Sequence, residues 1–275
     1  MIQKYAYIIG SGSIACRHSR ILKDFNYKPI CVTNRIDRLN KLYHKNNFLK
    51  IMRLNDILFS ENDIFIIANN TAQHNSACNA LLKLGVCAST IYCEKPGPSD
   101  FKEICLLYNL EFLNLPHNNF GKLVKVVHKA NATKWPSDIL WKDRYVFRKL
   151  YGGGALLTHS HELHHASKKV KSNALKIESI KYFRDKDGNN VDKYVSGLVS
   201  NVYFELGIME ENPIRFWEYE NTILHFYGNV AATGHSKNVI TIENNIIEQS
   251  YIDMWRELLV NKLKINDYNW ISEYV

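Results

Sequence analysis

Strand-like and helix-like stretches alternate through the first 115 residues of the chain, and this alternation limits the possible folds more than any other feature. Short β-branched or aromatic runs occur at residues 5–9, 30–33, 64–68, 90–93 and 111–115. Apolar residues with helical spacing lie between them, at residues 13–25, 36–45, 73–84 and 100–108. Consecutive strand–helix units of this kind build a parallel sheet with helices on both faces. The pattern predicts an N-terminal doubly wound α/β domain.

A glycine turn, Gly10-Ser11-Gly12-Ser13-Ile14-Ala15, joins the first strand to the first helix. In doubly wound sheets this turn brings the pyrophosphate of a dinucleotide to a helix N-terminus. Gly10 and Gly12 permit the tight turn and close approach, and Ala15 is small enough to replace the third glycine. A short glycine pattern can also serve only to reverse the chain. Its place behind the first strand favours dinucleotide binding by Gly10, Gly12, Ser13 and Ile14.

The choice of cofactor is usually set at the end of the second strand, where an acidic side chain holds the ribose hydroxyls of NAD. Here the chain reads Thr33-Asn34-Arg35, with no acid before Asp37. The planar guanidinium of Arg35 suits a 2′-phosphate, and Thr33 or Asn34 can add hydrogen bonds. We therefore expect NADP in preference to NAD. The alternative is that Arg35 is a solvated residue at a helix start.

Composition and charge narrow the class of protein. No apolar run approaches the ~18 residues of a membrane span, and the first strand begins too near Met1 for an export signal. All six cysteines fall in the first 105 residues without metal-ligand pairing, as in a reduced, cytoplasmic protein. The formal charge of +8 comes from scattered basic residues, which favours an anionic small molecule over nucleic acid. We expect a soluble cytoplasmic protein that binds neither nucleic acid nor membrane.

The sequence pattern changes near residue 117, which predicts one domain at residues 1–117 and a second at residues 118–275. In the second part we expect a helix at 121–130 and strands at 177–184, 198–206, 214–219 and 222–227. Asp185 to Gly188 supplies turn chemistry between two strands. Alternation in these runs indicates an open, mainly antiparallel sheet with one polar face. A last helix near 250–263 is expected to pack back onto the first domain.

The chain resembles the Gfo/Idh/MocA oxidoreductase family. Four stretches carry the likeness: the turn from Gly10 to Ala15, residues 66–74, Glu94-Lys95-Pro96, and residues 152–157 with the histidines that follow. The resemblance implies a Rossmann domain followed by an α+β domain with an open sheet. Family members often associate through that sheet, which implies a homodimer or homotetramer. Residues 134–136, 141–143 and 161–163 are similar to members found with sialic-acid-like and other surface-sugar pathways.

The resemblance also implies roles for particular residues. Lys95 maps onto a lysine near the nicotinamide and substrate, where an ammonium can stabilise developing alkoxide charge. Asn70, His74 and Glu94 fall in the same cofactor-contacting stretches. His161 is the best match to the general acid/base of the sugar-pathway version of the motif.

The second motif departs from the common family pattern. Thr158 stands where family enzymes commonly have an aspartate, and Glu162 occupies the histidine's place in the commoner spacing. The usual acid after the histidine is replaced by His164 or His165, so an orienting carboxylate for His161 is not apparent. The candidate catalytic set is therefore Lys95, His161, Glu162 and Thr158.

Three functions remain open at this point. The first is an NAD(P)-dependent oxidoreductase that moves a hydride between nicotinamide and a sugar or sugar nucleotide, in surface-glycan and polysaccharide biosynthesis. The second is a catalytically impaired relative that acts as a ligand sensor or partner-binding subunit, because Thr158 and His164 replace acids. The third comes from His161-Glu162-Leu163-His164-His165, which matches the HExxH pattern of zinc proteases. We expect no catalytic metal, since the pattern is short and the chain is rich in histidine.

Overall fold

A computed structural model describes residues 3–34, 48–98, 101, 103–107, 115, 119–135, 140–227, 237–242 and 245–263. Contacts divide the chain into two compact units. The first unit takes the described residues of 1–109 and 250–269, and the second takes those of 110–230 and 237–249. The predicted boundary at residue 117, the predicted helix at 36–45 and most of the predicted strand at 111–115 lie outside the described residues.

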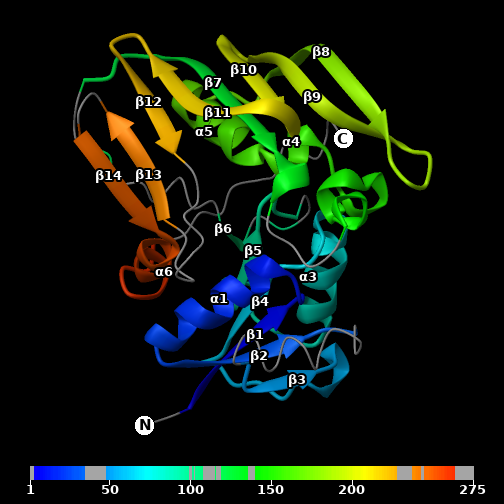
Figure 1. The fold of residues 1–275 in the computed structure, drawn as a ribbon. Helices are drawn as coiled ribbons and strands as arrows, with labels where there is room; N and C mark the ends of the chain where they lie inside the picture. The colour runs from blue at the N-terminus through cyan, green and yellow to red at the C-terminus, as the bar shows by residue number, and fades with distance from the viewer. Residues whose placement is uncertain are drawn as a thin grey trace. The chain divides into compact units, whose positions relative to one another are not determined.

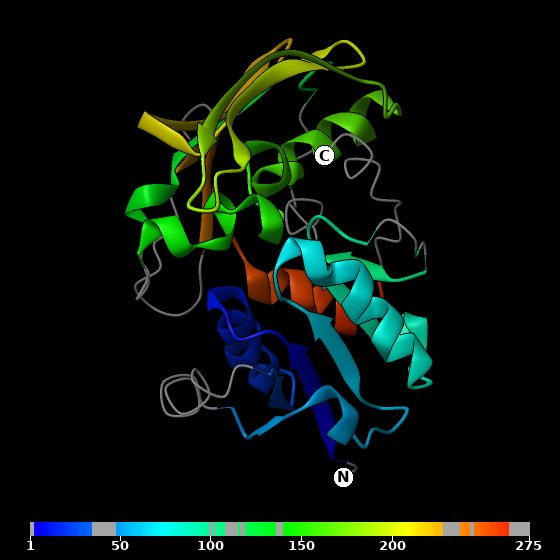
Figure 2. The same ribbon diagram turned by 90° about the vertical axis from the view of Figure 1, so that its right-hand side faces the viewer.

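The first unit is built on a six-stranded parallel sheet, as the alternating pattern predicts (Figure 1). Its strands are β1 (Lys4–Ile9), β2 (Tyr27–Val32), β3 (Lys50–Met52), β4 (Ile64–Ile67), β5 (Ile91–Glu94) and β6 (Cys105–Leu107), in the order β3-β2-β1-β4-β5-β6. Helices α1 (Ser13–Asp24) and α3 (His74–Lys83) lie on opposite sides of the strands (Figure 2). Short 3-10 turns occur at η1 (Leu54–Asp56), η2 (Thr71–Gln73) and η3 (Ala88–Thr90).

Continuous apolar runs place the strands of this sheet inside the core. All four residues of β4 and of β5 are buried, as expected for parallel strands covered on both faces. On one face, Tyr7 stacks on Phe65 with ring centroids 5.1 Å apart, and Cys78 and Leu81 of α3 belong to the same cluster. Each parallel strand ends at the same edge of the sheet, which brings the ends of β1, β4 and β5 together.

The predicted helix at 100–108 is wrong. Ile104 to Leu107 are at most 1% exposed, and Cys105–Leu107 pairs in parallel with β5 as strand β6. A run that is buried on every side has no polar face, so periodicity cannot distinguish a short helix from an interior strand.

The second unit is built on an eight-stranded sheet in the order β14-β13-β12-β11-β7-β10-β9-β8. Its strands are β7 (Leu123–Asn131), β8 (Leu175–Arg184), β9 (Asn190–Val199), β10 (Val202–Gly207), β11 (Met209–Tyr219), β12 (Thr222–Tyr227), β13 (Lys237–Ile242) and β14 (Asn245–Ser250). The described pairings are antiparallel, apart from β7 with β10, which is parallel. This confirms the predicted open, mainly antiparallel sheet. The short elements before the helices are η5 (Ala132–Lys134), η6 (Trp141–Asp143), η7 (Tyr145–Phe147) and η8 (Lys149–Tyr151).

The predicted helix at 121–130 is also wrong, because these residues form the inner strand β7. The buried residues of this stretch are Leu123, Val126, Val127 and Ala130, and their spacing is that of one helical face. The structure instead buries Val126 beneath helices and Val127 on the other face of the sheet, between β10 and β11. The stretch contains three valines, whose β-branched side chains favour strands. The helical spacing of its apolar residues obscured this signal.

The predicted strand at 198–206 is two strands. β9 ends at Val199 and β10 begins at Val202, with Ser200 in the left-handed region at φ 54°. The chain reverses here without the glycine or asparagine–glycine pair that usually signals a hairpin. The turn predicted at Asp185 to Gly188 is confirmed, because the Gly188 amide donates to the Asp185 carbonyl at 3.1 Å.

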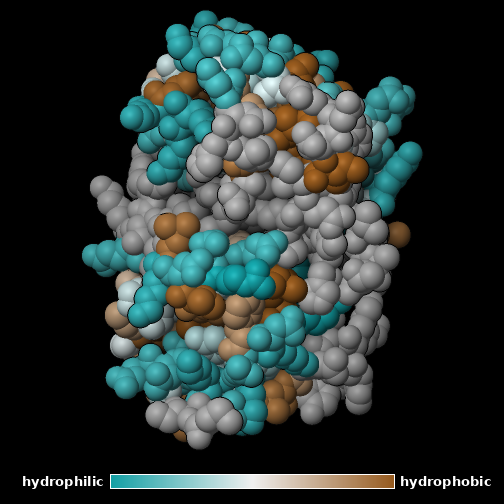
Figure 3. Space-filling model, turned by 90° about the vertical axis from the view of Figure 1, so that its left-hand side faces the viewer, coloured by the Kyte–Doolittle hydropathy of each residue, from teal (hydrophilic) through white to brown (hydrophobic). Residues whose placement is uncertain are grey.

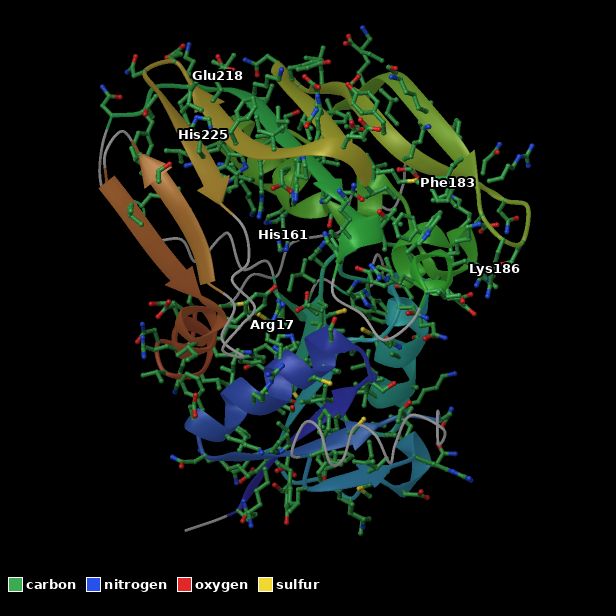
Figure 4. The ribbon with its side chains drawn as sticks, in the orientation of Figure 1. Arg17, His161, Phe183, Lys186, Glu218 and His225 are labelled. Carbon is green, nitrogen blue, oxygen red and sulfur yellow. The ribbon has the colours of Figure 1, made fainter. Side chains whose placement is uncertain are left out.

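Helices α4 (Ala155–Thr158) and α5 (Ser160–Val170) cover one face of this sheet, where they contact β7, β9 and β10 (Figure 2). Phe204 and Trp217 point to this covered face and are fully buried. The register places Tyr203 and Phe216 on the other face, which we call the open face. Glu218 and His225, labelled in Figure 4, share the open face with Phe216.

No described helix combines the length and apolar character that crossing a membrane requires. The side of the molecule drawn in Figure 3 carries mainly hydrophilic side chains with small apolar patches in each described part. All six cysteines are free, and five of them are buried.

The two glycines of the first turn give a matched pair for a stability test. Gly10 has φ +130°, and an added Cβ would lie 2.5 Å from the Ala68 carbonyl oxygen. Gly12 has φ −86°, and an added Cβ would meet nothing within 4 Å. We expect Gly10→Ala to lower the free energy of unfolding by roughly 3 kcal/mol, because it combines backbone strain with overlap.

Gly12→Ala should change the free energy of unfolding by only about 0.5 kcal/mol, since surface substitutions without strain have effects of that size. Urea unfolding of both variants checks this. Equal losses in the two variants would contradict the steric account of Gly10.

Candidate functional site

The glycine turn sits at the carboxyl end of β1 and is fixed from two sides. The Gly10 amide donates to the Val32 carbonyl at 3.0 Å, and the Ala68 amide donates to the Ile9 carbonyl at 2.9 Å. The backbone of Gly10 therefore passes against the end of β4, where a side chain has no room. This close packing holds the start of α1 in place.

The N-terminus of α1 carries the features of an anion site. Gly12 is its N-cap, no side chain caps the helix, and its first turn has no acidic residue. The first amide hydrogen bond within the helix is from Cys16 to Gly12, so the preceding amides of Ser13, Ile14 and Ala15 have no partner inside it. Open space faces Gly12, where a Cβ would stand. Free amides and the positive end of the helix dipole suit the pyrophosphate of a dinucleotide.

A second feature at the same edge also fits a ligand with hydrogen-bond donors. Asn69 follows β4 directly, and its Oδ1 atom is buried without a hydrogen-bond partner among the described residues. Buried polar atoms are normally satisfied. The ribose hydroxyls and carboxamide of a nicotinamide dinucleotide are groups of the required kind. The residues present at this edge therefore fit such a cofactor.

The residues predicted to select the cofactor are described only in part. Thr33 follows β2 and donates its amide to the Met52 carbonyl at 3.1 Å, while Asn34 is exposed. Arg35, on which the preference for NADP rests, lies outside the described residues. Thr33 and Asn34 are thus placed at the expected edge of the sheet.

Asn70 and His74 shape the segment after β4. The Asn70 carbonyl accepts the Gln73 amide at 2.8 Å and starts the 3-10 turn η2. His74 is 2% exposed, with Nδ1 2.7 Å from the Pro96 carbonyl oxygen and Nε2 3.3 Å from that of Asn69. Burial lowers the pKa of His74, so the ring is neutral and can donate to one of these two carbonyls. His74 thereby joins the ends of β4 and β5.

The Glu94-Lys95-Pro96 motif follows at the end of β5, with a cis bond between Lys95 and Pro96. Lys95 is partly exposed, whereas Glu94 is 8% exposed and its Oε1 lies 2.8 Å from Nε2 of His18. Burial raises the pKa of Glu94, but the His18 hydrogen bond and the charges of Lys95 and Arg17 outweigh it and hold that pKa below its usual value. Glu94 is therefore a buried anion, and Lys95 is the accessible member of the motif.

In the second unit the glycine run of residues 152–154 shapes the start of α4. Gly154 has φ +121°, and an added Cβ would lie 2.0 Å from an oxygen of Asp192. Asp192 accepts the Leu156 amide at 2.9 Å and so caps α4 from β9. Burial raises the pKa of Asp192. Gly154 is required because a carboxylate approaches the helix start this closely.

Thr158 and His161 are placed differently from one another. Thr158 is 5% exposed at the end of α4, and His159 between the helices donates from Nε2 to the Gly207 carbonyl at 2.9 Å. His161 lies in the first turn of α5 and is partly exposed (Figure 4). Of the predicted catalytic residues in this unit, His161 is the one with solvent-accessible surface suited to contact a substrate.

Glu162 is fully buried and takes part in an ion pair. Arg215 on β11 places Nε and Nη2 each 2.7 Å from Glu162 Oε1, and His128 Nδ1 on β7 lies 3.2 Å from the same atom. Burial raises the pKa of Glu162, but the charges of Arg215 and His128 outweigh it and hold that pKa well below its usual range. Glu162 is therefore an anion, and its contacts hold α5 against β11 and β7.

The histidines near Glu162 were also candidates for metal binding. Among the described residues, His128, His159 and Glu162 bring ligand atoms within 4.8 Å of one another. His165, the second histidine of the HExxH pattern, stacks on Trp217 with ring centroids 3.6 Å apart, and its Nε2 lies 2.9 Å from the Tyr219 hydroxyl. Arg215 already neutralises Glu162, so a dication there would meet an adjacent guanidinium. The arrangement fits an ion pair better than a metal.

Sequence reasoning missed the residues that support these groups: His18, His128, Asp192, Arg215 and Trp255. Each is distant in sequence from the residue it contacts. His18 lies within the first helix and Trp255 on α6 (Tyr251–Leu259), and nothing in their local pattern indicates a partner at Glu94. The one signal available was a charged residue inside a motif expected to be buried, since a buried carboxylate requires a partner.

No protein-family model matches the chain, and no curated protein matches it in sequence. Solved structures do share its fold. A point mutant of KijD10, a 3-ketoreductase from Actinomadura kijaniata in complex with TDP-benzene and NADP, has a TM-score of 0.63 at 13% identity. That match covers 98% of this chain and 94% of KijD10.

Two further structures show the same relationship. The dehydrogenase MviM from Clostridium difficile has a TM-score of 0.62 at 13% identity, covering 98% of this chain and 95% of MviM. UDP-N-acetylglucosamine 3-dehydrogenase GnnA from Acidithiobacillus ferrooxidans has a TM-score of 0.61 at 10% identity, covering 98% and 93%. These structures confirm the two-domain fold that the resemblance implies.

The Glu162–Arg215 pair gives a clear stability prediction. Arg215→Met removes the compensating charge and leaves Glu162 buried without it, which should cost about 3–5 kcal/mol of unfolding free energy. Adding Glu162→Gln to that variant removes the uncompensated anion and should recover a large part of the loss. Guanidinium unfolding of the three proteins measures this, and a double variant no more stable than Arg215→Met would contradict the role of the buried charge.

His165 gives a prediction of pH dependence. Burial, with a smaller contribution from Lys169, lowers its pKa from 6.5 to about 3. A depressed histidine pKa means that the unfolded chain binds the proton first, so stability falls as the pH drops from 6.5 toward 3, by up to about 1.4 kcal/mol per pH unit. His165→Phe keeps a ring against Trp217 and should lessen this slope. Unfolding free energies between pH 4 and 7 provide the test, and an unchanged slope would contradict it.

Proposed function

We propose that the chain is an NAD(P)-dependent oxidoreductase of the Gfo/Idh/MocA family that acts on a sugar or sugar nucleotide. The observation that carries the proposal is the uncapped N-terminus of α1 behind the Gly10 to Ala15 turn, at the end of the first strand of a six-stranded parallel sheet. The activities of two structural neighbours, a 3-ketoreductase and a UDP-N-acetylglucosamine 3-dehydrogenase, support the substrate class.

The cofactor site we propose is formed by this chain's backbone and by polar side chains at the sheet edge. The amides after Gly12 bind the pyrophosphate, Asn69 or Asn70 contacts the nicotinamide half, and Thr33, Asn34 and Arg35 receive the adenosine ribose. The nicotinamide supplies hydride transfer when it is bound. We propose NADP as the preferred form because no acid follows β2 and Arg35 does. KijD10 was crystallised with NADP, which agrees with this choice.

The catalytic roles we propose fall to Lys95 and His161. Both side chains are partly exposed, in contrast to their buried neighbours Glu94 and Glu162. The Lys95 ammonium stabilises negative charge on the substrate oxygen, and the His161 imidazole accepts or returns the hydroxyl proton. Glu162 contributes by fixing the helix that carries His161 through its ion pair with Arg215, while Thr158 is buried at the end of α4.

We further propose that copies of the chain associate as a homodimer or homotetramer through the open face of the eight-stranded sheet. Tyr203 and Phe216 lie partly exposed there, and Lys125 sits above both rings, 5.1 Å and 5.9 Å from their centroids. Aromatic residues flanked by paired charges are common at such interfaces. A cytoplasmic role in surface-polysaccharide biosynthesis is consistent with a sugar-nucleotide substrate, and we propose it on that basis.

The function is tested by calorimetric titration with NADPH and NADH, followed by a screen of nucleotide sugars for absorbance change at the nicotinamide wavelength. Binding of one cofactor with turnover of a sugar nucleotide is the expected result. Binding without turnover of any sugar would favour the sensor alternative, in which the fold is retained and the chemistry is lost. Binding of neither cofactor would contradict the proposal.

Lys95→Ala should lower kcat by about 10²–10⁴-fold, the range expected for loss of a group that acts in proton transfer. Cofactor affinity should change little, since the pyrophosphate site lies at the start of α1. Lys83→Ala is the matched control, because Lys83 is an exposed lysine at the end of α3 in the same unit. Full activity in Lys95→Ala would remove this lysine from the mechanism.

A further inference from the structure

Three buried polar side chains from distant parts of the chain form a continuous hydrogen-bonded series in the first unit. Trp255 on α6 and His18 on α1 are fully buried, and Glu94 at the end of β5 is 8% exposed. Trp255 Nε1 donates to His18 Nδ1 at 3.0 Å, and His18 Nε2 lies 2.8 Å from Glu94 Oε1. The series therefore connects the C-terminal helix to the motif that carries Lys95.

The chemistry of the three groups fixes the direction of every hydrogen bond. An indole nitrogen is a donor only, so His18 Nδ1 must be the unprotonated nitrogen that accepts from Trp255. The ring's proton is then on Nε2, which faces the Glu94 carboxylate and donates to it. The indole N–H at Nδ1 and the carboxylate at Nε2 therefore both require the same placement of the ring proton.

Ring packing holds the imidazole in this orientation. The His18 and Trp255 rings meet edge to face, with centroids 5.4 Å apart at 90°. Tyr251 approaches His18 at 6.0 Å, and Tyr92 approaches Trp255 at 5.3 Å. Arg17 (Figure 4) lies over Tyr251, with its guanidinium carbon 4.6 Å from the ring centroid. A ring flip of His18 would need this whole cluster to open.

We infer that Trp255 and His18 are positioning residues for the Glu94-Lys95-Pro96 turn: Trp255 keeps Nδ1 of His18 unprotonated, and His18 holds the Glu94 carboxylate in place behind Lys95. The kinetic part of this inference rests on the proposed function, whereas the hydrogen-bonded series does not. A packing role alone would require aromatic rings at these positions but no particular proton on His18. The positioning role therefore depends on the indole N–H of Trp255, whereas a packing role does not.

The first experiment observes the tautomer directly in the full chain. Nitrogen NMR of ¹⁵N-histidine-labelled protein, with the His18 signals assigned by their loss in His18→Gln, should show His18 protonated only at Nε2. Trp255→Phe keeps an aromatic ring but removes the donor, and should allow Nδ1 of His18 to carry a proton. Trp217→Phe is the matched control, since its indole nitrogen is equally buried and has no hydrogen-bond partner among the described residues. His18 protonated at Nδ1 in the natural protein, or unchanged in Trp255→Phe, overturns the inference.

The second experiment asks whether the series acts on the reaction as a unit. Trp255→Phe should lower kcat by about tenfold, equivalent to about 1.4 kcal/mol, with cofactor affinity unchanged. His18→Leu should cost at least as much. His18→Gln, whose amide can still donate to Glu94, should retain more activity than His18→Leu. In the His18→Leu background, Trp255→Phe should have no further effect on kcat, because Trp255 acts through His18.

The outcomes separate this inference from the proposed function. Additive losses in the double variant would show two independent packing defects and overturn the positioning role. If the natural protein turns over no sugar at all, the proposed function fails, and the NMR result alone then decides whether Trp255 keeps Nδ1 of His18 unprotonated.

Discussion

A carboxylate removed from water must be compensated, and each unit of this chain is organised around one such group. Glu94 in the first unit and Glu162 in the second are buried anions whose partners come from other elements. His18 and Trp255 bring α1 and α6 to the end of β5, while Arg215 and His128 bring β11 and β7 to α5. Because an unpaired buried charge is strongly destabilising, these contacts fix which elements lie next to each other.

The same pairing separates supporting residues from accessible ones. Lys95 follows Glu94 and His161 precedes Glu162, and in both cases the buried acid anchors the backbone from which its partly exposed neighbour projects. Side chains that act on a substrate have to be held by residues whose own positions are locked. The arrangement gives Lys95 and His161 such support within their separate units.

Two glycine-rich turns in the chain have different physical causes. At Gly10 the close carbonyl of Ala68 excludes a side chain, while at Gly12 space is left open in front of amides that have no partner within the helix. At Gly154 the nearby Asp192 carboxylate excludes a side chain and caps α4. The first turn thus leaves room for a ligand, whereas the second is filled by a residue of the protein itself. Glycines alone could not distinguish these cases.

The errors in the sequence-based predictions arose where burial was complete. Val126 and Val127 of β7 are both buried, on opposite faces, so their spacing imitated one face of a helix. Cys105 to Leu107 of β6 are all buried, so they show no alternation of polar and apolar residues from which a strand could be recognised. The Val199–Val202 reversal lacked glycine, so two strands looked like one. In each case tertiary contacts, rather than local preference, selected the structure.

The sequence by itself determined the strand–helix alternation of the first unit, the glycine turn and the antiparallel sheet of the second, because these depend on local period and turn chemistry. The candidate roles of Lys95 and His161 came instead from the family resemblance. Only the tertiary structure decided that Glu162 is an ion-pair partner of Arg215 and that His165 stacks on Trp217. It likewise decided that Glu94 is bound by His18 and His18 by Trp255, through two hydrogen bonds that join residues 76 and 237 positions apart along the chain. Contacts between residues so far apart leave no local sequence pattern, because the neighbours of each residue depend on how separate helices and strands pack together.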